Sequence, residues 1–368
     1  AQSMYDTTIG WRFINKALDK QYGTESMIQT AQNIADEMNI SREDQDRFAQ
    51  WSQEKAAKAQ NERKLAKEII PVKTPKVSIL TTVYNREDYI TECIDSILSS
   101  TFENWELILV DDNSKDNSFR IAKEYSLRDS RIRAYRNEKN LGDYPNRNKA
   151  ASYATGKYLK YLDADDTIYP HSLQIMVDAM ESFPQANLAI SHNILNSKNP
   201  FPFIISSHEA LSTFFFGKSV LGLGPSEAII RHNAFAKVNG FSGKQYLGDI
   251  ELWVKLALMG PVIALHPNLI FWRQHEDQQI VSERKNVDIL RIRHLHKLKV
   301  LNEIGNILSE EEKRKALEYT KFRYARMLWN YILFQRKILT ALKLYKNSKL
   351  TLMDVLKAPI TFKYSKKR

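Results

Sequence analysis

The sequence is poor in cysteine and contains no long apolar run. Cys93 is the only cysteine among 368 residues, which excludes an intrachain disulfide and a metal site built from several thiolates. No stretch of about 18 uncharged apolar residues occurs, and the N-terminal residues lack the basic and apolar regions of a signal peptide. We therefore expect a cytoplasmic protein. We also expect Cys93, in the helix-like segment TECIDSIL, to be a small buried apolar residue.

Acidic residues are scarce in the C-terminal part of the chain. Residues 281–368 hold 22 of the 54 Lys and Arg residues but only 8 of the 43 Asp and Glu residues, so the net charge of +11 belongs to this region. A basic region is typical of proteins that bind nucleic acid or an anionic membrane surface. Composition alone leaves both open, as well as a helical cap with a solvated basic face.

The pattern of polar and apolar residues changes twice along the chain. Residues 1–70 read as an irregular start and two polar helices, the second opening at SREDQ, where Ser41 can cap it. From Val77, short β-rich runs alternate with amphipathic helices, which predicts a mostly parallel sheet covered by helices. After residue 281 the pattern is helical again. With PVKTP as a linker, we predict three parts: 1–72, 73–280 and 281–368.

Polar residues collect where predicted strands end. Because parallel strands of an open α/β sheet bind ligands at their carboxyl ends, we expect the site along this edge. Asp111 and Asp112 can hydrogen-bond a base or ribose, or cap the next helix. Thr82 and Tyr84 suit contacts with a nucleotide. In NLGDYPNRNKA, Arg147 offers a charge for a diphosphate, or is a solvated surface charge.

The segment YLDADD places three carboxylates at the end of an apolar strand. Asp163, Asp165 and Asp166 repel one another unless a cation lies between them. Oxygen ligands of this type suit Mg²⁺ or Mn²⁺, which complete their shell with water and substrate phosphates. A solvated turn that caps the helix beginning near Pro170 is the alternative.

Taken together, the segments of residues 76–280 resemble the family 2 glycosyltransferases. The motifs that carry this resemblance, in order, are VSILTTVYNRE, SILSSTFENWELILVDDNSKD, NLGDYPNRNKA, GKYLKYLDADD and GDIELWVKLA. The resemblance implies an α/β fold of the GT-A type. It also implies inverting transfer of a sugar from a nucleotide-diphospho-sugar, here a UDP-sugar, with Mg²⁺ or Mn²⁺.

The same resemblance assigns roles to residues of this chain. It implies that Thr82 and Asp112 bind the nucleotide, that Asp163 lies on the ribose side and that Asp165 holds the metal. Asp249 in GDIELW falls where the family carries its catalytic base. Gly248 stands where the family often has Glu, so Glu251 remains a rival base. FWRQHEDQQI resembles the family's R-x-H segment, which suggests that Arg273 or His275 approaches the diphosphate or the metal.

The first segment resembles a different family. MYDTTIGWRFIN, QYGTESM, TAQNIADE and SREDQDRFAQWSQEKAAKAQ are similar to an internal, helical piece of the thiolases, over residues 4–72. The thiolase nucleophile and its partners belong to flanks that have no match here, so no nucleophile is carried over. We expect a non-catalytic fragment, foreign to the transferase, with an exposed apolar face.

These observations predict an enzyme of bacterial surface polysaccharide synthesis. The expected acceptor is a glycan or lipid-linked sugar, and the basic C-terminal region would place the protein on the inner face of the cytoplasmic membrane. We expect no nucleic acid partner. A non-catalytic nucleotide-sugar or nucleic-acid binding protein, and an acyl-CoA thiolase, are the alternatives.

Overall fold

The computed structural model describes residues 27–62, 74–191, 199–275, 278 and 286–358. The first motifs of the thiolase-like segment and most of the expected linker lie outside these residues. The chain divides into two compact units, Ala1–Lys73 and Thr74–Arg368. In the first unit, α2 spans Met27–Glu37 and α3 spans Arg42–Asn61. Ser41 Oγ accepts a hydrogen bond from the Asp44 backbone N–H at 3.1 Å, as the predicted N-cap requires.

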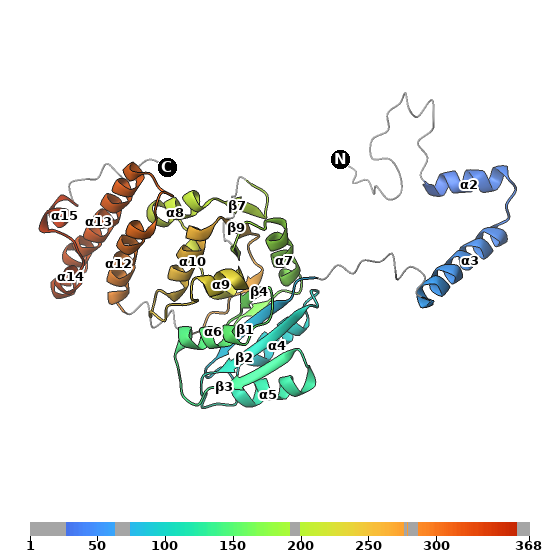
Figure 1. The fold of residues 1–368 in the computed structure, drawn as a ribbon, viewed down its shortest axis with the longest axis horizontal. Helices are drawn as coiled ribbons and strands as arrows, with labels where there is room; N and C mark the ends of the chain where they lie inside the picture. The colour runs from blue at the N-terminus through green and yellow to red at the C-terminus, as the bar shows by residue number, and fades with distance from the viewer. Residues whose placement is uncertain (1–26, 63–73, 192–198, 276–277, 279–285, 359–368) are drawn as a thin grey trace, which may run out of the picture. The chain divides into compact units, whose positions relative to one another are not determined.

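An eight-stranded sheet forms the centre of the second unit (Figure 1). Its order is β3-β2-β1-β4-β8-β6-β9-β7, with parallel pairs β3–β2, β2–β1, β1–β4 and β6–β9. Only β8 and β7 run against their neighbours, which confirms the mostly parallel sheet. The strands are β1 Val77–Val83, β2 Trp105–Asp111, β3 Ile132–Arg136, β4 Tyr158–Tyr161, β6 Leu188–Ser191, β7 Phe203–Ile205, β8 Ala228–Arg231 and β9 Val262–Leu265. A separate ribbon pairs β5 (Thr167–Ile168) with β10 (Ile270–Phe271).

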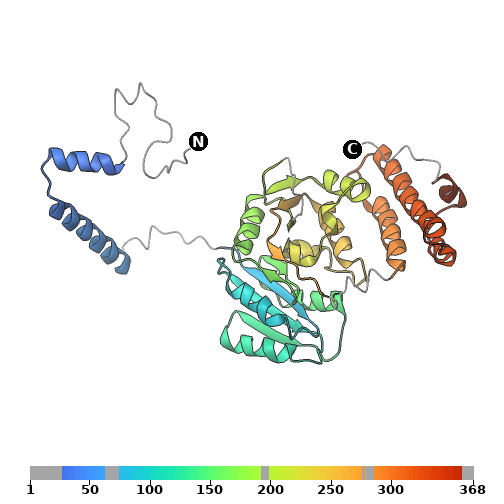
Figure 2. The same cartoon turned by 180° about the vertical axis from the view of Figure 1, so that it is seen from behind.

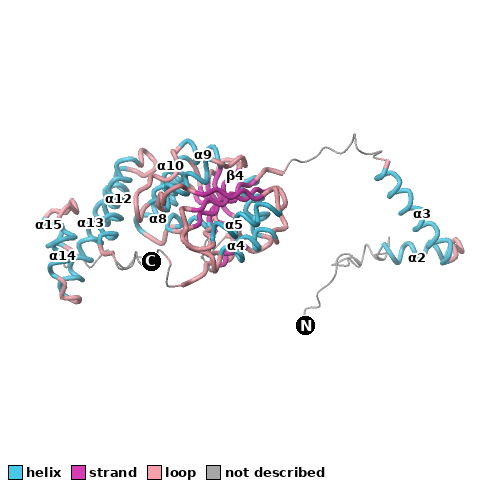
Figure 3. Tube along the Cα trace, turned by 90° about the horizontal axis from the view of Figure 1, so that it is seen from below, coloured by secondary structure: helices cyan, strands magenta, loops and turns pink. Residues whose placement is uncertain are grey.

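The side chains of successive strand residues pack alternately into two core layers, one on each face of the sheet. Ile79 packs on one face and its neighbour Leu80 on the other, as the two-residue repeat of a strand requires. The first layer is completed by α4 (Ile90–Leu98), α5 (Ser118–Arg128) and α7 (Ser172–Ser182). The second is completed by α6 (Asp143–Ser152), α8 (Ser207–Phe216) and α10 (Gly248–Met259). Figures 2 and 3 show the strands held between these helices.

Four helices follow the sheet region among the residues that the structure describes. They are α12 Asp288–Glu303, α13 Glu310–Leu333, α14 Ile338–Tyr345 and α15 Leu352–Lys357. Val300 of α12 and Ala316 of α13 belong to the core layer that contains α10, so these helices join the sheet domain. A small separate core, which includes Tyr324 and Leu344, holds α13, α14 and α15 together. Among the described residues, no helix has both the length and the apolar character needed to cross a membrane.

Candidate functional site

The loops that follow β1 and β2 are joined by hydrogen bonds at the carboxyl edge of the sheet. Asn85, at φ +52°, accepts from the Lys115 backbone N–H at 2.8 Å and donates its own N–H to Ser114 Oγ at 3.0 Å. Asparagine adopts this left-handed conformation more readily than most residues. Thr82 is partly buried and Tyr84 is exposed beside this junction. Both residues thus lie at the carboxyl edge of the sheet, and their contacts with a nucleotide remain predictions.

Three carboxylates crowd together after β4. One oxygen from each of Asp163, Asp165 and Asp166 lies within 4.8 Å of the others. Burial, together with the negative charges of Asp163 and Asp165, holds the pKa of Asp166 well above its usual range. A divalent cation would relieve this repulsion, and the donor set consists of the oxygen atoms that Mg²⁺ and Mn²⁺ prefer. The residues present therefore fit a metal of this type.

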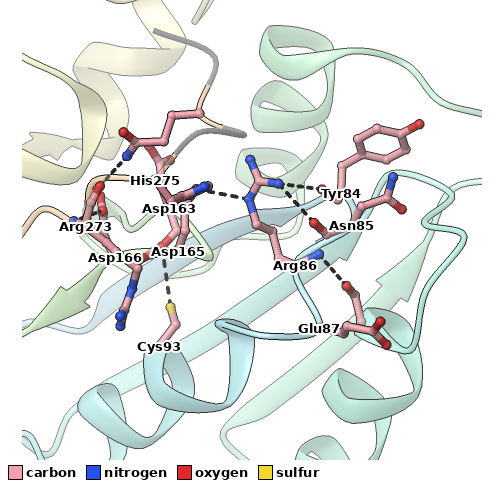
Figure 4. A network of polar contacts seen from close by, with 12 residues as sticks. Tyr84, Asn85, Arg86, Glu87, Cys93, Asp163, Asp165, Asp166, Arg273 and His275 are labelled. Atoms are coloured by element: carbon pink, nitrogen blue, oxygen red, sulfur yellow. Dashed lines mark hydrogen bonds and ion pairs between the residues drawn. The ribbon is translucent and has the colours of Figure 1, made fainter. Parts of the chain in front are cut away.

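Two arginines and a histidine lie around this acidic cluster (Figure 4). Arg86 Nε donates to Asp165 Oδ2 at 3.0 Å, and His275 Nε2 lies 3.0 Å from the same oxygen. Arg273 Nε donates to the Asp165 carbonyl at 3.0 Å, and its guanidinium pairs with Glu92. The R-x-H segment therefore lies against the acidic cluster, although 110 residues separate His275 from Asp165 in the chain. Contacts of Arg273 and His275 with a metal or diphosphate remain predictions.

The buried pair Asp111 and Asp112 shapes the neighbouring loops. Asp112 accepts hydrogen bonds from Asn137 Nδ2 at 2.7 Å, from the Leu141 N–H at 2.8 Å and from the Gly142 N–H at 2.9 Å. These bonds fix the loop that leads into α6. Asp111 accepts from the Ser114 N–H at 3.0 Å. Both carboxylates thus have protein partners in this structure, and their contacts with a nucleotide remain predictions.

One face of α6 connects the acidic cluster to Asp249. Arg147 Nε donates to Asp143 at 2.7 Å, and another guanidinium nitrogen lies 2.8 Å from Asp163 Oδ1. Tyr144, one turn earlier on the helix, donates its hydroxyl to Asp249 Oδ1 at 2.5 Å. Arg147 is buried, and its charge is balanced by carboxylates of the protein. Its contact with a diphosphate remains a prediction.

Asp249 lies in the first turn of α10, against Tyr144. Burial raises the pKa of Asp249, although the hydrogen bond from Tyr144 and the charge of Arg147 oppose the rise. The preceding residue, Gly248, lies so close to Tyr144 that an added Cβ would meet ring atoms at 2.3–2.5 Å. The departure from the family pattern at Gly248 therefore has a steric reason: the tyrosine ring takes the space that a side chain would need.

Glu251, the rival base, belongs to a buried ion-pair network. It accepts from the Ser242 hydroxyl, binds Lys244 Nζ at 3.0 Å, and lies 3.6 Å from Lys299 Nζ of α12. Burial alone would raise the pKa of Glu251, but these hydrogen bonds and charges outweigh it and lower the pKa to about 2. A carboxylate held this firmly in its charged form is a weak proton acceptor. The assignment of Asp249 or Glu251 as the base remains a prediction.

Three residues of the site were not predicted from the sequence. Arg86 lies in the loop directly after β1, where the rule that selected Tyr84 could have found it. Tyr144 carries no sequence signal, because its role depends on how α6 meets α10. Lys160 is fully buried in β4, its Nζ donates to the Tyr161 carbonyl at 2.8 Å, and burial lowers its pKa to about 7. Cys93 is buried, as predicted, and burial raises the pKa of its thiol.

Two family models match the chain. Residues 78–238 match the model described as Glycosyl transferase family 2, and residues 2–99 match Thiolase, N-terminal domain. The two matches overlap at residues 78–99, which contain all of β1 except Val77. Because β1 pairs with β2 and β4, the overlap belongs structurally to the sheet of the second unit.

Curated relatives divide in the same way. The putative glycosyltransferase EpsE of Bacillus subtilis is 43% identical over 108 residues, 29% of this chain and 39% of EpsE. Glycosyltransferase GlyG of Streptococcus pneumoniae is 24% identical over 223 residues, 56% of this chain and 73% of GlyG. A 3-oxoadipyl-CoA/3-oxo-5,6-dehydrosuberyl-CoA thiolase of Escherichia coli is 58% identical over 69 residues, 19% of this chain and 17% of the thiolase. The chain thus spans well under half of EpsE and of the thiolase.

Solved structures are similar in fold. S. aureus TarS 1-349 in complex with UDP-GlcNAc has a TM-score of 0.55 and 19% identity, covering 77% of this chain and 81% of TarS 1-349. The mannosyltransferase PcManGT of Pyrobaculum calidifontis, in complex with GDP-Man and Mn²⁺, has a TM-score of 0.50 and 16% identity, covering 81% of this chain and 89% of its own. At such identities the likeness concerns the fold, which is the GT-A type. Within this fold, residues 78–238 match the glycosyl transferase family 2 model, and a segment similar to thiolases precedes them.

Proposed function

We propose that this chain is an inverting glycosyltransferase, which moves a sugar from a nucleotide-diphospho-sugar onto an acceptor hydroxyl. The observation that carries the proposal is the connection through α6. Arg147 binds Asp163 of the acidic cluster, and Tyr144 of the same helix face binds Asp249. Two separate carboxylate groups are thus held in one site, as a displacement with a base on one side and a leaving diphosphate on the other requires.

The donor is proposed from the fold and the strand-end residues. Thr82, Tyr84, Asp111 and Asp112 lie where an open α/β sheet receives a nucleotide. Two proteins of similar fold, TarS and PcManGT, have been solved with UDP-GlcNAc and GDP-Man respectively, and among such donors we propose a UDP-sugar. Arg273, beside the acidic cluster, has the charge to contact the diphosphate.

Asp163, Asp165 and Asp166 are proposed to hold Mg²⁺ or Mn²⁺, with His275 beside them. A bound divalent ion would neutralise charge on the departing diphosphate. The PcManGT complex contains Mn²⁺, which agrees with this choice of ion. Arg86 and His275 both contact Asp165 Oδ2, so they orient this carboxylate, and the Arg86 guanidinium balances its charge within the protein.

Asp249 is proposed as the base. As the acceptor oxygen bonds to the anomeric carbon, the bond from that carbon to the diphosphate breaks, and the acceptor's proton passes to the Asp249 carboxylate. A raised pKa suits a proton acceptor, because the acceptor strength of a carboxylate increases with its pKa. Tyr144 positions Asp249, since its hydroxyl donates to one carboxylate oxygen and leaves the other for the acceptor.

The acceptor is proposed to be a glycan or a lipid-linked sugar of a bacterial surface polysaccharide. The relatives, the putative glycosyltransferase EpsE and glycosyltransferase GlyG, both come from bacteria, which agrees with this setting. The thiolase alternative has little support, because the matching segment spans only 17% of a thiolase. A thiolysis assay with acetoacetyl-CoA tests it directly.

The decisive experiment compares Asp249→Asn with Glu251→Gln in a panel of nucleotide-sugars. We expect Asp249→Asn to lower kcat by roughly 10²–10⁴-fold with unchanged donor affinity, because an amide cannot accept the proton. Glu251→Gln is expected to lower thermal stability through the Lys244 and Lys299 contacts while retaining turnover. Full turnover in Asp249→Asn would refute the assignment of Asp249 as the base. If the wild-type protein bound a nucleotide-sugar without transfer or hydrolysis under any condition, the non-catalytic alternative would hold.

A further inference from the structure

The junction between α13 and α14 presents large apolar side chains to solvent. Residues 333–339 are all exposed, and with residues 340–342 they form what we call the α13–α14 corner. Phe334 is 78% exposed and Leu339 is 83% exposed, and the corner also exposes Leu333, Ile338 and Leu342. An apolar group of this kind, gathered in one short segment, is typical of an interaction surface.

The backbone of the corner is fixed by hydrogen bonds. The Phe334 and Gln335 N–H groups donate to the Asn330 carbonyl at 3.0 and 3.1 Å, and the Lys337 N–H donates to the Tyr331 carbonyl at 2.8 Å. Arg336, at φ +54°, closes the turn in the left-handed conformation. The turn therefore holds its apolar side chains outward in a defined arrangement.

The inward face of α14 is already packed against other helices of the domain. Leu344 is fully buried in the small core with Tyr324, whose hydroxyl donates to the Leu344 carbonyl at 3.0 Å. Ile338, Leu339 and Leu342 lie on the opposite side of the helix, as their spacing requires. A helix that is apolar on both sides is usually buried on both sides, so the outer side of α14 is suited to a second apolar medium.

The corner lies in a stretch of purely positive charge. Residues 319–353 contain eight Lys and Arg residues and no Asp or Glu. Seven of these cations are exposed: Arg323, Arg326, Arg336, Lys337, Lys343, Lys346 and Lys349. Lys343 also contacts Asp288 at 3.0 Å. Beside the corner, a hollow of about 480 Å³ between α12 and α13 is lined in part by Arg323, Arg326 and Tyr331. The ligand of this surface should therefore be both anionic and apolar.

We propose that the α13–α14 corner docks onto an anionic lipid bilayer. Leucine, isoleucine and phenylalanine side chains enter the boundary between headgroups and acyl chains, while Lys and Arg bind the headgroup phosphates. A nucleic acid would use the cations but gives no apolar medium to Phe334 and Leu339. The helices of the corner belong to the same domain as the candidate site, and Lys299 of α12 pairs with Glu251 of α10. A protein docked through this corner would therefore work at the membrane surface.

The test is co-sedimentation of the full chain with vesicles, which needs no sugar transfer and so stands apart from the proposed function. We expect binding to vesicles of phosphatidylglycerol mixed with phosphatidylcholine, weakened by salt, and little binding to phosphatidylcholine alone. The double variant Phe334→Ser/Leu339→Ser and the double variant Arg336→Gln/Lys337→Gln should each weaken binding roughly tenfold or more. Leu127→Ser is the matched control, because Leu127 is an equally exposed leucine on α5.

The variants change exposed side chains, and circular dichroism will check that each keeps the helical content and melting temperature of the wild type. Wild-type binding to neither vesicle would overturn the proposal, as would corner variants that bind like the Leu127→Ser control.

A dimer in analytical ultracentrifugation that dissociates in Phe334→Ser/Leu339→Ser would identify the corner as an interface between copies. RNA binding that is lost in Arg336→Gln/Lys337→Gln, without vesicle binding in the wild type, would identify a nucleic acid site. A protein shortened after Ala358 should retain binding; its loss would assign the interaction to residues 359–368.

Discussion

Removal of the Tyr144 hydroxyl should move the pH dependence of transfer in a predictable direction. The hydroxyl donates to Asp249 at 2.5 Å and stabilises the charged carboxylate, opposing the rise in pKa that burial causes. Tyr144→Phe removes this stabilisation and should raise the pKa of Asp249 further. The base accepts a proton only in its charged form. The acidic limb of the pH profile of kcat/KM should therefore move to higher pH.

The size of this shift follows from the kind of hydrogen bond that is lost. A hydrogen bond to a charged group contributes about 1.5–3 kcal/mol. At about 1.36 kcal/mol per pKa unit, its loss corresponds to a displacement of roughly one to two pH units. At a pH well above the limb, the variant should recover most of its turnover, since Asp249 is then charged in both proteins.

The assay is the pH profile of kcat/KM for transfer, measured in parallel with a matched variant. Tyr125 donates its hydroxyl to Asp95 at 2.7 Å on the surface of the same domain, so Tyr125→Phe removes a similar bond far from the base. Its profile should match that of the wild type. An unmoved acidic limb in Tyr144→Phe, or an equal movement in Tyr125→Phe, would show that the limb reports a group other than Asp249.

Three further outcomes follow from the structure. Gly248→Ala should lower the free energy of unfolding by about 1–3 kcal/mol, because the new Cβ would overlap the Tyr144 ring, whereas Gly222→Ala meets nothing within 4 Å and should not; urea unfolding of both variants checks this. Asp165→Ala should abolish metal-dependent transfer with little loss of stability, because it removes one of three crowded carboxylates; full activity of this variant in chelator-treated buffer would contradict the metal site. Deletion of residues 1–72 should leave kcat and KM nearly unchanged, since the described site residues lie after Val77; steady-state kinetics of the shortened chain would expose any contribution of the first unit.

Local patterns predicted the sheet and one half of the site. Two features depend only on residues that are neighbours in the chain: the apolar pattern of β1 and β2, and the position of YLDADD directly after β4. Such features can be predicted from the sequence. The break between α13 and α14 was harder to predict from the sequence, because Arg336 adopts φ +54° and no glycine or proline marks that position. The apolar pattern alone continues through the break.

The other half of the site depends on contacts between distant segments. Tyr144 and Asp249 are 105 residues apart, and nothing in either segment indicates that α6 faces the start of α10. The same applies to Glu251, which the sequence left as a rival to Asp249. Its neighbours Ser242, Lys244 and Lys299, which lower its proton affinity, come together only in the folded chain.

The close approach of Gly248 to Tyr144 makes positions 144 and 248 mutually dependent. A glutamate at 248, as the family often has, needs the volume that the tyrosine ring now fills, so the two residues exclude each other. Homologues should therefore fall into two groups, one with an aromatic residue at 144 and glycine at 248, the other with a small residue at 144 and glutamate at 248. In each group a different partner would stand beside the same aspartate. Gly248→Glu alone should therefore destabilise the protein, and a small residue at 144 in the same variant should restore its stability.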